Sequence, residues 1–255
     1  MLSFREIGQA PAPTVVFLHG CPTSVDHLEP LARGIADTHR CIMMELPGYG
    51  RSSYPPPGDG NVVGRGEIAI VATLRSIGVR RLSLVGHSLG GYRALSLACS
   101  GLFDVDAVIA LGGFARLPEE IGAGLAAVAP AVRSGSLDLE TGASERFLAP
   151  ENRTRANVAE VNRWAHATTR SVLADELEAA AQLPDLRPAL AGTHARVVAR
   201  VGAMDTASPP HLSEEIAAAL QGGSCEIVAN AGHALVLEDF VGTLESIKRA
   251  LRMSA

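Results

Sequence analysis

The chain has 255 residues, of which 47% are hydrophobic, and a net charge of −5 from 27 acidic and 22 basic side chains. This length and apolar content suffice for one large core, so we expect one main domain with at most an insertion. The mild negative charge without a basic stripe argues against a nucleic-acid partner. No apolar run approaches the ~20 residues that span a bilayer, and the N-terminus lacks a long apolar signal segment. We therefore expect a cytoplasmic protein with no membrane partner.

The four cysteines limit the possible metal and redox chemistry. Cys21, Cys41, Cys99 and Cys225 lie far apart in the chain and show no C-x-x-C spacing. Structural zinc sites and disulfide frameworks use closely spaced cysteines, so we expect buried free thiols here.

Strand and helix patterns alternate through the first 113 residues. Short apolar runs predict strands at residues 2–7, 14–18, 41–44, 82–85 and 105–111. Apolar residues at helical spacing predict helices at residues 27–37 and 67–77 and directly after residue 88. This alternation predicts an α/β fold with a mostly parallel sheet flanked by helices.

The fourth predicted strand leads into the sequence Gly-His-Ser-Leu-Gly at residues 86–90. A serine at the apex of such a strand–helix turn has a strained, positive-φ backbone and an exposed hydroxyl at a helix N-terminus. Gly86 and Gly90 suit this turn, because a Cβ at either position would meet the other arm. Because the motif is short, its support comes from the flanking strand and helix. The competing interpretation of Ser88 is a glycine-rich turn in a nucleotide-binding fold.

Residues 114–190 break the alternation. Four helices are predicted with no strand between them, at residues 118–128, 139–148, 157–166 and 171–182, and Pro130 is expected to end the first. We interpret residues 114–190 as a helical cap inserted into a core of residues 1–113 and 191–255. Apolar side chains of the cap predict a modest apolar pocket, with candidates at Leu117, Leu125, Val128, Phe147, Trp164 and Leu173.

The strand–helix pattern returns with predicted strands at residues 195–201 and 225–228, which gives about seven strands. Polar loops containing Asp205 and His233 follow these two strands. Carboxyl ends of parallel strands meet at one edge of a sheet, so both loops are expected near Ser88 and the loop at residues 19–21. A serine hydroxyl needs an adjacent base, and the base needs a group that orients it. The order Ser88, Asp205, His233 satisfies this need in the chain order of an α/β-hydrolase triad.

At these residues the chain resembles the α/β-hydrolase fold superfamily, in its serine-hydrolase branch with a helical cap. The resemblance covers essentially the whole chain. It rests on five features in a fixed order: His19-Gly20, the loop at residues 47–52, Gly86–Gly91, the Asp205 loop ending in Ser208-Pro209, and Gly232-His233 followed by Glu238. Glu45 departs from the family pattern, in which Asp usually precedes the Pro-Gly-x-Gly loop, and this bears on the packing of that loop rather than on the triad.

The resemblance implies a role for each matching residue. Ser88 would be the nucleophile, His233 the general base and acid, and Asp205 the orienting carboxylate. The backbone N–H groups of Cys21 and Leu89 would form the oxyanion hole. Four further residues would support these motifs: His19, Gly20, Gly86 and Gly90. The reaction would need neither a metal nor an organic cofactor.

Other residues of the same types are interpreted as structural. Asp175 and Asp185 do not follow a buried strand, and His87 is expected to pack beneath the nucleophile. The remaining histidines are expected to be solvated or structural: His27, His39, His166, His194 and His211. The cap arginines are expected on a solvated face rather than around an anionic substrate: Arg133, Arg146, Arg153, Arg155 and Arg163.

The predicted function is hydrolysis of a small carboxylic ester, thioester or lactone through an acyl-Ser88 intermediate. The partner would be a small molecule with an acyl group. A serine at residue 88 disfavours the alkyl-ester chemistry of aspartate-nucleophile relatives. The same triad also serves C–C bond hydrolases, prolyl-type aminopeptidases and perhydrolases. A hydroxynitrile-type lyase and a non-catalytic small-molecule receptor are the alternatives of another class, and the oligomeric state is left open.

Overall fold

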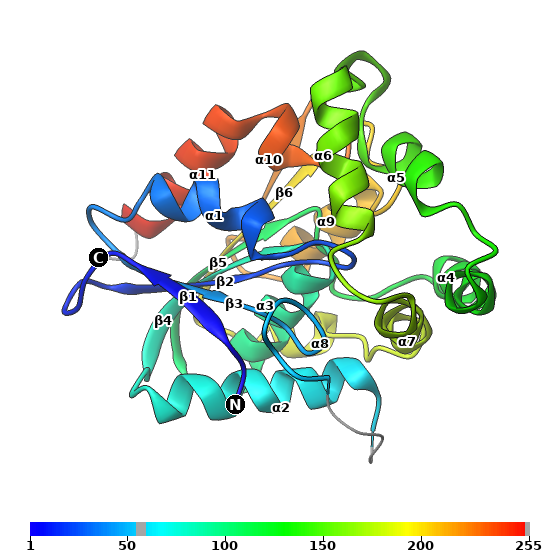
Figure 1. Cartoon of the computed structure of the whole chain (residues 1–255). Helices are drawn as coiled ribbons and strands as arrows, with labels where there is room; N and C mark the ends of the chain where they lie inside the picture. Colours follow the sequence, from blue (N-terminus) through cyan, green and yellow to red (C-terminus); the bar gives the residue numbers. More distant parts are fainter. Residues whose placement is uncertain (55–59, 253–255) are drawn as a thin grey trace.

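A seven-stranded sheet forms the centre of the computed structural model, which describes residues 1–54 and 60–252 (Figure 1). The strands lie in the order β1 (Phe4–Ile7), β3 (Arg40–Met44), β2 (Thr14–Leu18), β4 (Arg81–His87), β5 (Asp104–Leu111), β6 (Arg196–Gly202) and β7 (Ser224–Val228). All neighbouring strands pair in parallel except β1, which is antiparallel to β3 at the edge. The predicted α/β class and strand number are confirmed.

Helices cover both faces of the sheet (Figure 1). One face packs under α1 (Val25–Arg33), α10 (Leu235–Glu238) and α11 (Phe240–Arg252). The other face packs under α2 (Val62–Ser76), α3 (Leu89–Cys99), α8 (Arg187–Leu190) and α9 (Pro210–Ala218). In β2, Val15 and Phe17 point to the first face, and Val16 and Leu18 point to the second. This two-sided burial explains the continuous apolar run that predicts the strand.

A group of helices connects β5 to β6 and lies to one side of the sheet (Figure 1). These are α4 (Glu119–Ser134), α5 (Leu139–Phe147), the 3₁₀ helix η1 (Pro150–Asn152), α6 (Arg155–Ala165) and α7 (Arg170–Ala180). We keep residues 114–190 as a proposed cap, although α8 at the end of this range packs on the sheet. No helix within residues 1–54 and 60–252 combines the length and apolar content needed to cross a bilayer.

The prediction that Pro130 ends the first cap helix is wrong, because α4 continues to Ser134. Proline inside a helix costs a backbone hydrogen bond and about 3 kcal/mol. In α4, however, Ala129 and Val132 on either side of this proline are buried against α7, where they pack with Leu173. Burial of this helix face offsets the cost, a tertiary effect that local propensity does not report.

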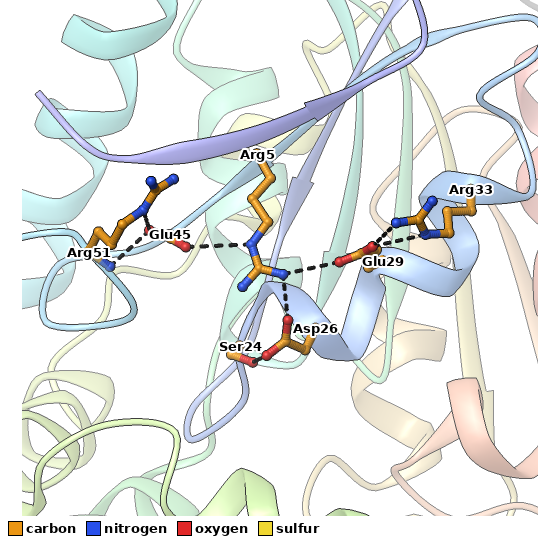
Figure 2. Close-up of polar contacts among 7 residues, drawn as sticks. All are labelled: Arg5, Ser24, Asp26, Glu29, Arg33, Glu45 and Arg51. Carbon is orange, nitrogen blue, oxygen red and sulfur yellow. Dashed lines mark hydrogen bonds and ion pairs between the residues drawn. The ribbon is translucent and has the colours of Figure 1, made fainter.

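The loop after β3 is organised by Glu45, the residue that departs from the family pattern. Its carboxylate is buried and accepts a hydrogen bond from the Arg51 backbone N–H at 2.9 Å. Figure 2 shows the Arg5 side chain between Glu45 on one side and Asp26 and Glu29 of α1 on the other, with Arg5 Nε 3.7 Å from Glu45. The longer Glu side chain therefore closes the loop at residues 46–52 and joins it to an ionic network with β1 and α1.

Candidate active site

The sharp turn between β4 and α3 places Ser88 at its apex. Ser88 has φ 54° and ψ −123°, and it is the one non-glycine residue with positive φ in the described part of the chain. Its backbone N–H donates to the Leu111 carbonyl at 2.8 Å, which fixes the turn to β5. A Cβ at Gly86 would lie 2.2 Å from the Gly90 carbonyl oxygen, and one at Gly90 would lie 2.1 Å from the Leu18 oxygen. These contacts hold a serine conformation that costs about 1–3 kcal/mol in isolation.

Asp205 and His233 form a buried pair at the ends of β6 and β7. Asp205 Oδ2 lies 2.7 Å from His233 Nδ1, and both residues are almost fully buried. The other carboxylate oxygen of Asp205 accepts from the backbone N–H groups of Ala207 at 2.9 Å and Ser208 at 2.7 Å. Nδ1 is therefore the protonated nitrogen of the neutral imidazole, and Nε2 is left with its lone pair.

Two features outside the pair hold it in place. A Cβ at Gly112, whose φ is +53°, would lie 3.0 Å from His233 Nδ1 and 3.1 Å from Asp205 Oδ2, so the pair packs directly on this glycine. The Glu238 carboxylate accepts from the backbone N–H groups of Gly232 at 2.9 Å and Ala234 at 3.1 Å, on both sides of His233. The imidazole thus belongs to a rigid loop.

The N–H groups of Cys21 and Leu89 have no hydrogen-bond acceptor within residues 1–54 and 60–252. Leu89 begins α3, where the first N–H groups lack intrahelical partners and the helix dipole favours negative charge. Cys21 belongs to a loop that approaches Ser88 closely, since a Cβ at Gly20 would lie 2.8 Å from Ser88 Cβ. Both residues line the same cavity as Ser88, so both N–H groups are available to an anion beside the hydroxyl.

His19 joins two of the loops at this edge of the sheet. Its Nδ1 lies 2.9 Å from the Gly20 carbonyl, and the Leu46 backbone N–H donates to its Nε2 at 3.2 Å. A carbonyl only accepts, so Nδ1 carries the proton and Nε2 does not. Complete burial lowers the pKa of His19 to about 4, which keeps the ring neutral and bonded to both loops.

A cavity of about 340 Å³ opens above these groups. Ser88 and His233 both line it, together with mostly apolar side chains from α4, α5 and α7. Neither Ser88 Oγ nor His233 Nε2 is hydrogen-bonded to another side chain of the described residues. Such contacts often tighten only when substrate binds. The cavity therefore brings together a strained serine, an imidazole with a free nitrogen and two open N–H groups.

Comparison with known proteins agrees with this arrangement. A family model described as the alpha/beta hydrolase family matches residues 15–242. This chain belongs to the alpha/beta hydrolase family. A 2-succinyl-6-hydroxy-2,4-cyclohexadiene-1-carboxylate synthase of Salmonella paratyphi B is 30% identical to it over 96% of both chains.

Solved structures extend the likeness to the whole fold. A thermophilic esterase from Thermogutta terrifontis is 21% identical, and the match covers 99% of this alpha/beta hydrolase and 93% of the esterase with a TM-score of 0.88. An enol-lactonase from Burkholderia xenovorans is 20% identical, with 98% and 96% of the two chains covered and a TM-score of 0.87. At these identities the comparison establishes the shared fold.

The competing acids and most cap arginines of this alpha/beta hydrolase lie away from the Asp205–His233 pair. Asp175 accepts hydrogen bonds from Tyr54 and Arg133, and Asp185 pairs with Arg187 at 2.7 Å. Arg146 alone among the five cap arginines considered above lines the cavity.

Five of the six predicted pocket residues line the cavity: Leu117, Leu125, Val128, Phe147 and Leu173. Trp164 is the exception, and its predicted place in the pocket is wrong. Its ring packs edge-on against His27 of α1, with centroids 4.2 Å apart, because helical spacing alone does not show which neighbour a buried ring will meet.

A row of three histidine rings lies beneath the site. The rings of His27 and His87 have centroids 4.6 Å apart, and those of His87 and His233 are 4.7 Å apart. His87 Nε2 donates to the backbone carbonyl of His233 at 3.0 Å, so this residue fixes the loop as well as packing below it. Burial lowers the pKa of His27 to about 3 and that of His87 well below its usual value.

Sequence reasoning did not identify Glu176 of α7, whose buried carboxylate lines the cavity. It pairs with Arg93 of α3, which is also buried. A charged residue inside the otherwise apolar helix after Ser88 is the signal in the sequence that could have pointed to this pair.

Proposed function

We propose that the protein is a serine hydrolase that cleaves a small carboxylic ester, thioester or lactone through an acyl-Ser88 intermediate. The observation that carries this proposal is the Asp205–His233 pair, whose imidazole shares a cavity with the strained Ser88. An esterase and an enol-lactonase with the same fold are consistent with it.

The proposed reaction begins when His233 Nε2 takes the proton from Ser88 Oγ as this oxygen attacks the acyl carbon. Asp205 holds the Nδ1–H tautomer and stabilises the imidazolium that forms. The tetrahedral oxyanion would accept from the N–H groups of Cys21 and Leu89, and one such donor is typically worth ~3 kcal/mol to the transition state. His233 then gives its proton to the leaving oxygen or sulfur.

Deacylation would repeat these steps with water in place of the serine. His233 takes a proton from water as the water oxygen attacks the acyl carbon, and the Ser88 oxygen leaves and receives that proton. The products are a carboxylic acid and the free enzyme. The same backbone N–H groups would stabilise the second oxyanion, so no metal or organic cofactor is needed.

A second candidate follows from the Salmonella relative, whose name describes the synthesis of a cyclohexadiene carboxylate. A site for an anionic substrate needs cationic partners. Among the described lining residues, Arg146 is the only arginine or lysine, whereas Asp138 and Glu176 are acidic. The charges of this cavity therefore favour a neutral acyl substrate over a substrate that carries a carboxylate.

Pre-steady-state kinetics with 4-nitrophenyl butyrate would test the proposal. We expect a burst of nitrophenol equal to the enzyme concentration, absent from Ser88→Ala. The matched control is Ser100→Ala at the opposite end of α3, which should leave the burst unchanged. Steady release without an acyl-enzyme, or no release, would contradict it. Aldehyde and cyanide formed from a cyanohydrin would instead favour a lyase, and binding without turnover would favour a receptor. Faster cleavage of a C–C bond, a prolyl amide or a peracid would favour one of the related hydrolases.

A further inference from the structure

Glu176 places a buried carboxylate in the wall of an otherwise mostly apolar cavity. The residue belongs to α7, is 2% exposed, and lines the cavity together with Ser88 and Cys21. Burying an ionised carboxylate is costly unless it is paired and hydrogen-bonded. A leucine at this place would line the cavity at no such cost, so the function of the carboxylate needs an explanation.

Two buried donors hold the Glu176 side chain in one orientation. Arg93 Nη2 donates to Oε1 at 2.9 Å, and the Tyr49 hydroxyl donates to Oε2 at 2.6 Å. Arg93 lies five residues after Ser88 on α3 and is 1% exposed, so the pair is fixed to the helix that carries the serine. The arginine and carboxylate charges cancel. A carboxylate has about four acceptor positions, of which these bonds use two and the Cys21 thiol beside Glu176 uses a third, so one position remains for another hydrogen bond.

Glu176 also lines the same cavity as the serine of the proposed reaction. Burial together with the neighbouring Glu176 carboxylate raises the pKa of the Cys21 thiol well above its usual value, and the backbone N–H of the same Cys21 is one of the two proposed oxyanion donors. The neighbouring Gly20 approaches within van der Waals distance of Ser88, as the 2.8 Å from its ideal Cβ position to Ser88 Cβ indicates. An acyl group bonded to Ser88 would therefore occupy the cavity that Glu176 also lines.

The charge of this wall determines which substituent it favours. A carboxylate on the acyl group would lose its hydration and has no proton to donate to the Glu176 oxygens. An ammonium group would lose its hydration in an apolar cavity and face a carboxylate that Arg93 already neutralises. A hydroxyl donates one hydrogen bond, has a much smaller desolvation cost than either ion, and fits the remaining acceptor position.

We propose that the acyl group of the substrate carries a hydroxyl two or three bonds from the carbonyl, and that this hydroxyl donates to Glu176. This inference rests on the proposed serine-hydrolase function. It makes Glu176 a specificity-determining residue, with Arg93 and Tyr49 as the residues that position it.

A matched set of ethyl esters tests this substrate class in a pH-stat. We expect the wild-type kcat/KM for ethyl 3-hydroxybutyrate to be about tenfold higher than for ethyl butyrate, as one hydrogen bond to a charged acceptor implies. Ethyl 3-methoxybutyrate keeps the oxygen but lacks the donor, so it should react no faster than the butyrate. Ethyl 3-aminobutyrate and monoethyl succinate should be slower than the hydroxy ester.

Variants assign the preference to Glu176. Removing the pair together, with Arg93→Met and Glu176→Met, avoids an uncompensated buried charge and should reduce the hydroxybutyrate-to-butyrate ratio to about one. Glu178→Gln is the matched control, since this acid lies on the same helix but pairs with the exposed Arg133 and does not line the cavity. Its ratio should equal that of the wild type.

The outcomes separate this inference from the function on which it rests. Equal wild-type rates for the hydroxy, methoxy and unsubstituted esters, or a faster amino or succinate ester, would overturn the hydroxyl proposal while leaving the hydrolase function intact. A preference that survives loss of the Arg93–Glu176 pair would overturn the assignment to Glu176. If the wild type cleaves none of the esters and a phosphonate does not modify Ser88, the proposed hydrolase function itself fails.

Discussion

The two walls of the cavity face each other but are held by different forces. On the sheet side, backbone atoms are packed so tightly around Ser88 that glycine is the one residue type that fits at Gly86 and Gly90. On the cap side, apolar helix faces form the wall, and a buried ion pair between Arg93 and Glu176 ties α7 to α3. Close backbone packing on the sheet side holds the proposed catalytic residues in one geometry. Side chains on the cap side can change, and alter the substrate selectivity, without disturbing that geometry.

Loss of the base should have the largest effect on activity. We expect His233→Ala to lower kcat/KM for 4-nitrophenyl butyrate by at least about 10⁴-fold, because His233 is the one imidazole among the described residues that line the cavity. His211→Ala, outside the cavity, is the control and should be unaffected. Steady-state kinetics of both variants would check this, and a loss of less than tenfold for His233→Ala would place the base elsewhere.

Paired glycine substitutions compare the two walls directly. Gly90→Ala should lower the free energy of unfolding by more than about 3 kcal/mol, since its Cβ would lie 2.1 Å from the backbone oxygen of Leu18. Gly124 of α4 has nothing within 4 Å of its Cβ position, so Gly124→Ala should instead increase stability by about 0.5–1 kcal/mol. Guanidinium denaturation measures both, and equal effects would show that the sheet side is not the tightly packed wall.

The buried ion pair gives a stability prediction on the cap side. Arg93→Met alone should lower the free energy of unfolding by about 3 kcal/mol, because it leaves the Glu176 charge buried and unpaired. Adding Glu176→Met should restore most of this loss. A double-mutant cycle by denaturation would measure the coupling, and additive losses would mean that the two charges do not depend on each other.

Stability should also fall in mild acid because of buried neutral histidines. Burial lowers the pKa of His19 to about 4 and that of His27 to about 3. The unfolded chain, with an ordinary histidine pKa near 6.5, therefore binds more protons below that pH. Above about pH 6.5 these histidines do not lower the free energy of unfolding. As the pH falls below that value the free energy of unfolding decreases, by about 2 kcal/mol for each residue at pH 5.

Comparing denaturation at pH 8 and pH 5 for the wild type and His27→Phe isolates one of these residues. The variant should lose about 2 kcal/mol less between the two pH values. His194→Phe is a control at an exposed position, and its loss should match that of the wild type. An unchanged loss in His27→Phe would mean that this ring is protonated in the folded protein.

The sequence predicts the sheet side of the cavity better than the cap side. The seven strands follow from apolar runs that are buried on both faces, and Ser88, Asp205 and His233 fall on loops that strand order brings to one edge. These are local or topological constraints, and a single chain displays them.

The cap side depends on how helices pack, which periodicity does not determine. The sequence predicts a helix end at Pro130, but α4 continues because packing against α7 buries the residues around this proline. The sequence predicts Trp164 in the pocket, but its ring packs on His27 of α1. Arg93 and Glu176 lie 83 positions apart, and neither residue type predicts the other.

Labelling with a fluorophosphonate is the most direct test of the central claim that His233 activates Ser88. Peptide mass spectrometry should find the phosphonate on Ser88 alone, and the labelling rate should fall by at least about 10³-fold in His233→Ala. Modification of another residue, or an equal labelling rate without the imidazole, would contradict the account.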